Sequence, residues 1–283
     1  MAENIVLSNT EYKVVGTRPI RHDGTDKVTG RAKYGGDYQS AGMLYGKVLR
    51  SPHAHARIKS IDTSKALALP GVEAVITGAD MPGANKDGAS RGTQMASDNL
   101  LARTKAVYKG HPIAAIAAAN QHVAEAALDL IKVDFEVLSP VMDVRAAMAD
   151  NAPLIQEDLT TTDLGERTDK KSNIATHVQF TQGDIEKGFA AADVIVEQEF
   201  TNEMVHQGYL EPQTASAIWN ENGDITIWTS TQGAFTARDA MAPLLDVPVS
   251  KIKVVPMEIG GGFGGKIPVY LEPLAALLSK KTG

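Results

Sequence analysis

Five glycines surround one phenylalanine near the C-terminal end of this 283-residue chain, in the run Gly260-Gly261-Gly262-Phe263-Gly264-Gly265-Lys266. Glycine has no Cβ and adopts positive φ without a steric penalty, so this backbone can turn sharply and lie close to a ligand. Its successive amide hydrogens can point into one concavity and hold a phosphate or another electron-rich group. Residues 252–259 have the apolar pattern of a strand and 271–278 that of a helix. We therefore expect a glycine-rich turn from strand to helix, a geometry that suits anions.

Two nucleotide-binding motifs share this spacing. Gly260, Gly262 and Gly265 fit the G-x-G-x-x-G pattern of dinucleotide folds, but the acidic residue needed about 20 positions later is not in the sequence. Gly260, Gly265 and Lys266 fit the P-loop pattern, but Ile267 lacks the hydroxyl that binds magnesium at that position. A tight turn that binds no ligand is the third interpretation.

The ordered set of motifs along the chain resembles the molybdenum-cofactor subunit of the xanthine dehydrogenase and aldehyde oxidase family, from about Val15 onward. The resemblance rests on the glycine run and on three upstream segments, which are Arg50-Ser51-Pro52-His53-Ala54-His55-Ala56-Arg57-Ile58, Tyr209-Leu210-Glu211-Pro212 and Thr231-Gln232-Gly233. It implies an α+β fold in which an α/β hammerhead domain precedes the first part of a molybdopterin-binding α/β domain. We expect the chain to be the N-terminal portion of a longer subunit, or one piece of a split subunit.

The resemblance also implies which residues contact the molybdopterin-type cofactor. Gln232 would donate its side-chain amide to an oxo ligand of the metal, and Phe263 would lie close to the metal with its backbone amide facing that ligand. The pterin holds the molybdenum, so no side chain is expected to bind the metal directly, and the chemistry belongs to the cofactor. The predicted cofactor-binding residues are Gln232, Gly261, Gly262, Phe263, Gly264 and Gly265.

The substrate pocket and the catalytic base are also inferred from the resemblance. Family members that hydroxylate purines carry a glutamate after the lysine, whereas this chain has Ile267, so a xanthine-specific pocket is not expected. The family's base glutamate lies downstream of Gly283, so no catalytic residue is expected in this chain, and the isolated chain is expected to be inactive. Glu211 is predicted to be structural, and Glu272 to complement the dipole at a helix start.

The chain contains no cysteine, which excludes a disulfide framework, a thiolate zinc site and an iron–sulfur cluster held by this chain. If the protein works in electron transfer, another polypeptide must carry the electrons away, and the resemblance implies partner subunits that carry 2Fe-2S clusters and FAD. Carbon monoxide dehydrogenases of the family use an active-site cysteine, and none occurs here. The net charge of −6 argues against nucleic-acid binding. With no bilayer-spanning run and no secretion signal, we expect a cytoplasmic protein.

Sequence patterns divide the chain into a polar lead-in (1–20), the hammerhead domain (21–142), a linker (143–176) and a partial molybdopterin-binding domain (177–283). Residues 78–98 are predicted to be a loop, and Pro243 is expected to kink or end its helix early. The predicted strands cover 44–49, 56–61, 72–77, 113–118, 133–138, 194–200, 215–219 and 225–229. The predicted helices are a short one ending at residue 69 and those at 123–131, 185–191 and 234–245.

Two interpretations of function from different classes remain open. The chain is part of a molybdenum hydroxylase that oxidises a C–H bond of an aldehyde or N-heteroaromatic substrate, or it is a non-catalytic binding or assembly module. His53 and His55 face one side of a predicted strand. Because no third ligand is nearby, we predict a surface or interface role for them rather than a metal site.

Overall fold

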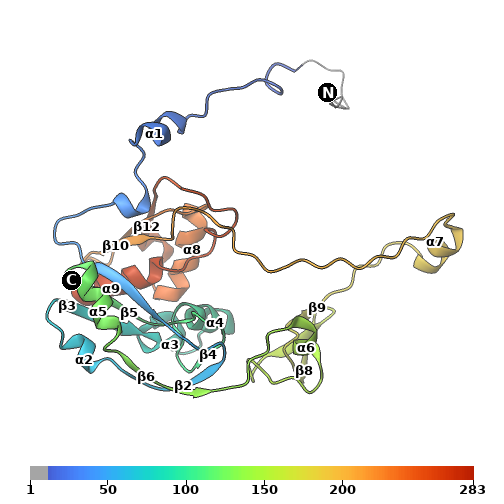
Figure 1. Cartoon of the computed structure of the whole chain (residues 1–283), viewed down its shortest axis with the longest axis horizontal. Helices are drawn as coiled ribbons and strands as arrows, with labels where there is room; N and C mark the ends of the chain where they lie inside the picture. Colours follow the sequence, from blue (N-terminus) through green and yellow to red (C-terminus); the bar gives the residue numbers. More distant parts are fainter. Residues whose placement is uncertain (1–11) are drawn as a thin grey trace.

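Two antiparallel sheets of three strands each form the first half of the protein, whose computed structural model describes residues 12–283 (Figure 1). The beginning of the predicted lead-in, residues 1–11, lies outside the described residues. One sheet has the order β1-β5-β3 and the other β4-β2-β6. Strand β5 lies in the middle of its sheet and is buried along almost its whole length, as its apolar sequence predicts. The strands are β1 (Tyr45–Arg50), β2 (Ala56–Asp62), β3 (Val72–Thr77), β4 (Lys105–Ala106), β5 (Pro112–Ala118) and β6 (Lys132–Val137).

Small helices cover these two sheets. Helix α5 packs its fully buried Ala124 and Ala127 against β1 and β5, and it begins where Asn120 Oδ1 accepts a hydrogen bond from the Val123 amide at 2.9 Å. The segment 78–98, predicted as a loop, contains the 3₁₀ helix η2 and the helices α3 and α4. Helix α4 was not predicted because its sequence is polar and it buries only Ser97 and Leu100. The helices are α2 (Ser64–Leu67), η2 (Gly78–Asp80), α3 (Pro82–Asn85), α4 (Arg91–Leu100) and α5 (Gln121–Leu128).

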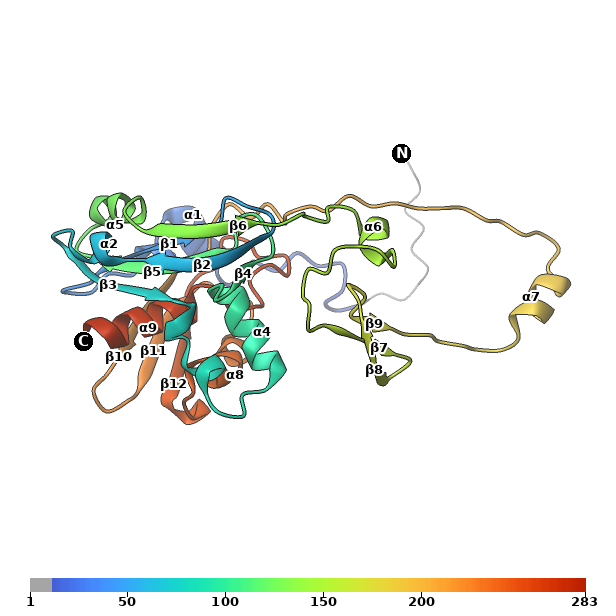
Figure 2. The same cartoon turned by 90° about the horizontal axis from the view of Figure 1, so that it is seen from below.

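The middle of the chain extends away from the main body in both views (Figures 1 and 2). The predicted linker contains a short helix and a small sheet of order β8-β7-β9. The chain then runs out to α7, at the predicted helix, and returns in extended form (Figure 2). The elements are α6 (Val144–Met148), β7 (Thr160–Asp163), β8 (Glu166–Lys171), β9 (Thr176–His177) and α7 (Ile185–Ala191).

The predicted strand at 194–200 is wrong for this structure. These residues are extended but pair with no strand among residues 12–283. Their apolar side chains are exposed, with Val196 at 82% and Phe200 at 80%. A strand needs a neighbour for its backbone hydrogen bonds, and an apolar pattern alone does not supply one.

A mixed sheet, β10-β11-β12, dominates the C-terminal part. The β10–β11 hairpin turns at Asn222-Gly223 as predicted, and α8 then crosses over to place β12 parallel to β11. Pro243 lies inside α8, which continues to Leu245, so the expected early end did not occur. The elements are β10 (Ala215–Trp219), β11 (Ile225–Thr229), α8 (Ala234–Leu245), η3 (Val249–Lys251), β12 (Ile252–Pro256) and α9 (Glu272–Thr282).

One hydrophobic core joins the β1-β5-β3 sheet to this C-terminal sheet. Helix α9 packs against β10 and β11 and also against β3 and β5. Helix α3 lies so close to α8 that a Cβ on Gly83 would come within 1.9 Å of the Pro243 carbonyl oxygen. The fully or almost fully buried side chains of this shared core include Ile76, Met81, Leu101, Ile225, Ile227, Met241, Leu245 and Leu274.

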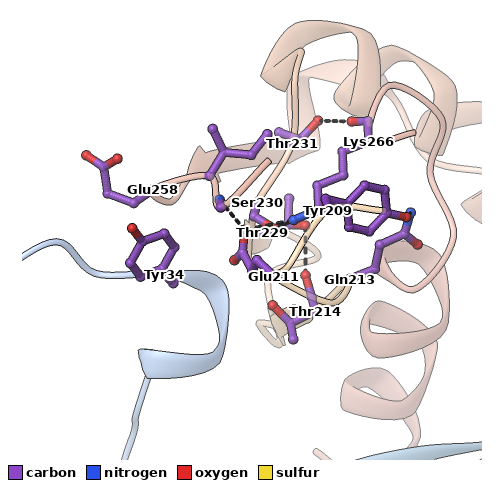
Figure 3. A network of polar contacts seen from close by, with 12 residues as sticks. Tyr34, Tyr209, Glu211, Gln213, Thr214, Thr229, Ser230, Thr231, Glu258 and Lys266 are labelled. Atoms are coloured by element: carbon purple, nitrogen blue, oxygen red, sulfur yellow. Dashed lines mark hydrogen bonds and ion pairs between the residues drawn. The ribbon is translucent and has the colours of Figure 1, made fainter. Parts of the chain in front are cut away.

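The N-terminal residues described also reach the C-terminal sheet. After α1 (Gly24–Thr29), Tyr34 forms a parallel bridge with Glu258, just beyond β12. The 3₁₀ helix η1 (Gly35–Asp37) follows, and Tyr38 stacks on Trp228 with ring centroids 4.2 Å apart. Figure 3 shows Tyr34 facing Glu258 beside the site described next. Residues 24–38 therefore lie against the C-terminal sheet, and Tyr34 contacts the backbone that enters the glycine run.

Candidate cofactor-binding site

The glycine run forms a folded loop after β12, defined here as the loop 260–266. Its backbone has positive φ at Gly261 (99°), Phe263 (49°) and Gly264 (88°), and the Gly265 amide donates to the Gly262 carbonyl at 2.7 Å. Phe263 is one of three non-glycine residues with positive φ among those described. A bulky side chain in this conformation is strained, so the surrounding contacts hold it there.

Four of the five glycines are required because the loop lies directly on neighbouring side chains. An added Cβ at each would come closer than 3.0 Å to a side-chain atom, a distance that real Cβ atoms essentially never show. The distances are 2.5 Å to Glu211 Cβ from Gly260, 2.9 Å to Tyr209 Cβ from Gly261, 2.6 Å to Gln232 Oε1 from Gly262 and 2.8 Å to Tyr209 Cε1 from Gly265. The inner face of the loop is therefore packed.

The outer face of the loop is open at Phe263 and Gly264. A Cβ on Gly264 would meet nothing within 4 Å, and Phe263 is 72% exposed. The Phe263 amide has no hydrogen-bond acceptor among residues 12–283. At Phe263 the loop thus carries an exposed aromatic ring and a backbone donor that has no acceptor among residues 12–283.

Gln232 fixes the middle and the end of the loop. Its Oε1 accepts from the Gly264 amide at 2.9 Å and the Lys266 amide at 3.2 Å, and its own backbone amide donates to the Lys266 carbonyl at 3.0 Å. Backbone N–H groups can only donate, so the atom that faces both of them is the carbonyl oxygen. The side-chain NH₂ of Gln232 has no acceptor within the described chain and remains free to donate.

Lys266 points inward rather than toward a ligand. Its Nζ lies 2.7 Å from Glu211 Oε2 and 3.2 Å from Ser230 Oγ, and 5.0 Å from the centroid of the Tyr209 ring (Figure 3). The side chain is 1% exposed. A P-loop lysine must reach the phosphates of its nucleotide. The buried ion pair therefore removes the P-loop interpretation.

The helix after the loop does not present an anion site either. Six residues separate Gly265 from the start of α9 at Glu272. Glu272 Oε2 accepts from the amides of Tyr270 and Leu271, at 2.9 Å and 3.1 Å, and Oε1 accepts from Thr229 Oγ1 at 2.8 Å. The carboxylate therefore ties the backbone just before α9 to the end of β11, which is a structural role as predicted, and six residues separate Gly265 from the helix start.

The histidines of the upstream motif form no metal site. His55 is only 4% exposed and its Nδ1 lies 2.8 Å from the Ser139 carbonyl, so the predicted surface role is wrong for this residue. His53 packs edge-on against Phe135 at 5.1 Å. No group of three or more His, Asp or Glu side chains in the part of the chain described could hold a metal ion.

His111 is also buried and structural. Its Nδ1 accepts from the Val107 amide at 3.2 Å, and Nε2 lies 2.7 Å from the Asp98 carbonyl. Burial lowers the pKa of His111 below its usual value, against the opposing effect of the Asp98 carbonyl. The neutral ring is therefore the form that the fold selects.

The structure brings most of the predicted residues together and adds others. Gln232 contacts Gly262 and Gly264 directly, while Ile267 follows the loop and is 47% exposed. The supporting side chains Tyr209, Glu211, Gln213 and Lys266 were not predicted as site residues. Gln213 Nε2 donates to the Gly265 carbonyl at 2.9 Å. Tyr209 and Glu211 lie in the motif Tyr209-Leu210-Glu211-Pro212, which was the available sequence signal for them.

Comparison with known families agrees with this geometry. The family model of the aldehyde oxidase and xanthine dehydrogenase a/b hammerhead domain matches residues 29–139, and that of the molybdopterin cofactor-binding domain matches residues 167–283. The chain belongs to the xanthine dehydrogenase and aldehyde oxidase family of molybdopterin-binding proteins. The predicted α+β fold, a hammerhead domain followed by a molybdopterin-binding domain, is confirmed.

Individual relatives have the following extents of similarity. The chain is 37% identical over 264 residues to a probable xanthine dehydrogenase subunit of Bacillus subtilis, covering 93% of this chain and 33% of that protein. It is 31% identical to the nicotinate dehydrogenase large molybdopterin subunit of Eubacterium barkeri, covering 96% and 60%. The crystal structure of a Cu,Mo-CO dehydrogenase aligns with a TM-score of 0.76 at 33% identity, covering 93% and 33%. The chain thus spans about a third to three fifths of the length of these relatives.

Proposed function

We propose that this chain forms part of a molybdenum hydroxylase that oxidises a C–H bond of an aldehyde or N-heteroaromatic substrate with oxygen taken from water. The observation that carries the proposal is the two-sided loop 260–266, packed on its inner face and open at Phe263 and Gly264. The match of residues 167–283 to a molybdopterin cofactor-binding domain supports it. The cofactor would supply the oxidative chemistry when bound.

The residues that line the open face fit such a cofactor. Gln232 has a free NH₂ whose direction is set by two backbone hydrogen bonds to its oxygen. The Phe263 amide is a second free donor, and the glycines at 261, 262, 264 and 265 leave no side chain of their own on the loop. Two preorganised donors suit an electron-rich acceptor, and the charge of that acceptor strengthens their hydrogen bonds. We assign Gln232 and the residues 261–265 to cofactor binding.

Ile267 is assigned to the substrate pocket. Its side chain follows the loop directly and is about half exposed. An apolar residue offers no hydrogen bond to a purine ring, and a buried polar group left without a partner costs about 1–3 kcal/mol. An aldehyde or a less polar heteroaromatic compound is therefore the proposed substrate class.

Partner subunits are part of the proposal. The chain has no cysteine with which to hold an iron–sulfur cluster, so electrons taken from the substrate would pass to an iron–sulfur subunit and an FAD subunit. None of the helices among residues 12–283 is long and apolar enough to cross a membrane. We propose the cytoplasm as the location of the complex.

The alternative, a non-catalytic binding or assembly module, has little support in its nucleotide-binding form. That form relied on the motif that ends at Lys266, and this lysine is engaged with Glu211 in the interior. No other observation on the described residues favours that alternative.

The proposal is tested by purifying the complete protein together with its subunit partners. Elemental analysis should give close to one molybdenum per copy of this chain, with a fluorescent oxidised pterin released on denaturation, and an artificial electron acceptor should be reduced when an aldehyde is added. Absence of both molybdenum and pterin would contradict the proposal. Since the chain spans about a third of several relatives, the 283-residue chain alone is expected to show no turnover.

A further inference from the structure

A single carboxylate oxygen connects the two ends of the loop 260–266. Glu211 Oε2 accepts from the Gly260 amide at 2.6 Å and pairs with Lys266 Nζ at 2.7 Å. Gly260 is the first residue of the loop and Lys266 is the last. The side chains of Glu211 and Lys266 are 12% and 1% exposed, so water does not compete for these contacts.

Neighbouring groups complete the enclosure of the Lys266 ammonium. Ser230 Oγ, at the end of β11, accepts a hydrogen bond at 3.2 Å, and the Tyr209 ring lies under the charge at 5.0 Å. The Lys266 carbonyl accepts from the Thr231 hydroxyl at 3.2 Å as well as from the Gln232 amide. The last residue of the loop is thus held by both its side chain and its main chain.

Such an arrangement is poorly explained by stability alone. A buried ion pair costs so much desolvation that replacing both partners with neutral groups of similar size is often neutral or stabilising. What neutral partners cannot reproduce is a charge-assisted link between two loop ends, because charge-assisted hydrogen bonds are shorter and about twice as strong as neutral ones.

We propose that Glu211 and Lys266 are positioning residues that clamp the two ends of the loop 260–266 and so present Phe263 and Gly264 outward in a fixed geometry. This inference rests on the proposed function for its consequence, cofactor retention, but the clamp itself is a property of this chain. Neither residue touches the open face of the loop. Their effect on the cofactor passes through the backbone between them.

The test uses three variants of the complete protein: Lys266→Met, Lys266→Arg and the double variant Glu211→Gln with Lys266→Met. The single methionine variant leaves an unpaired buried carboxylate and is expected to lower the unfolding temperature. The double variant removes both charges and is expected to recover most of that loss. The matched control is Lys251→Met with Asp224→Asn, which removes an ion pair of 2.9 Å that is partly exposed and outside the loop.

The decisive readout is hydrogen exchange of backbone amides 260–267, measured beside the unfolding temperature and molybdenum content. We expect exchange in this segment to be about tenfold faster or more in both methionine variants, to stay near wild type in the control, and to recover at least in part in Lys266→Arg, whose charge can still pair with Glu211. Molybdenum content should follow the exchange rate and not the unfolding temperature.

Two outcomes would overturn the proposal. Loop exchange that returns to the wild-type rate in the double variant would show that the pair contributes stability only. Unchanged exchange in Lys266→Met would show that no clamp exists. If the wild-type complex lacks molybdenum and pterin, the proposed function fails, whereas the exchange comparison still decides whether the clamp orders the loop.

Discussion

Substituting alanine for Gly262 should displace the Gln232 side chain, whereas alanine at Gly264, two positions further on, should only strain the backbone. A Cβ at position 262 would lie 2.6 Å from Gln232 Oε1 and 2.7 Å from its Cδ. Reaching the 3.4 Å of ordinary contact requires that gap to widen by about 0.8 Å. A Cβ at position 264 meets nothing within 4 Å. Its cost is confined to the positive φ of 88°.

The magnitude at position 262 follows from the hydrogen bonds that Gln232 would lose. Its Oε1 accepts from the amides of Gly264 and Lys266. Each such bond contributes about 0.5–1.5 kcal/mol, so displacing Gln232 should cost about 1–3 kcal/mol of local stability. Alanine at position 264 should cost about 1–2 kcal/mol through backbone strain. These two losses of local stability are similar in size. The energetic coupling of each substitution to Gln232→Ala therefore distinguishes them.

A double-mutant cycle with Gln232→Ala measures this coupling. Gln232→Ala removes the same hydrogen bonds and also opens the space, so adding Gly262→Ala should cost little more, and the pair should deviate from additivity by about 1–3 kcal/mol. Gly264→Ala should add its cost to that of Gln232→Ala. Local opening free energies from hydrogen exchange of residues 260–267 provide the measurement, since 1–3 kcal/mol corresponds to about a 5- to 150-fold change in rate.

The reasoning would be refuted by additive effects of Gly262→Ala and Gln232→Ala, because the inner face of the loop would then not rest on Gln232. In the molybdenum-containing complex, Gly264→Ala should reduce cofactor content, since the added methyl group occupies the open face. Gly264→Val should do so more strongly. Normal molybdenum content in both variants would remove this face of the loop from the site.

Three further predictions concern other parts of the molecule. In a thermal unfolding assay, Gly83→Ala should lower the free energy of unfolding by about 1–3 kcal/mol or more, because its Cβ would clash with the Pro243 carbonyl. The control Gly92→Ala in α4, where the nearest neighbour of an added Cβ is at 3.8 Å, should be neutral or stabilising. Burial lowers the pKa of His111, so the unfolded chain gains a proton at a higher pH than the folded chain does. Stability is therefore full above about pH 6.5 and is lost as pH falls below it, and His111→Gln should flatten this slope in unfolding temperatures. Ile267→Glu should raise kcat/KM for a purine relative to an aldehyde by about 10- to 100-fold, and an unchanged ratio would contradict the assignment of this residue to the pocket.

Local signals in the sequence predicted those elements whose pattern is strong by itself. The hairpin around Asn222-Gly223 has the predicted ends because its turn dipeptide fixes the register. Helix α7 has its predicted ends as well, and Asp184 Oδ1 caps it by accepting from the Lys187 amide at 3.1 Å. Both elements need only neighbouring residues to form.

Elements that depend on distant partners were predicted less well. Residues 194–200 have a strand pattern but no neighbouring strand within the described part of the chain. Helix α4 has a polar sequence and is held by contacts with α3 and α8. Pro243 remains inside α8, where the neighbouring Leu244 and Leu245 are buried in the shared core, so tertiary packing outweighs the preference of proline to end a helix.

The same distinction applies to the site. Motif order was enough to place Gln232 beside the glycine loop, and the structure shows their contact. It could not show that the oxygen of Gln232, rather than its nitrogen, faces the loop, since this depends on two amides 32 and 34 residues away. The burial of Lys266 against Glu211 was equally hidden, because an ion pair across 55 positions has no local pattern.

The central claim is that the open face of the loop 260–266 lies against a molybdenum-bearing pterin. The most direct measurement is an anomalous difference map, recorded at the molybdenum absorption edge from crystals of the complete protein with its partners. The account predicts a single strong peak on the side of Phe263 and the Gln232 NH₂, with pterin density along the glycines. A peak remote from the loop, with Phe263 and Gly264 facing bulk solvent, would contradict it.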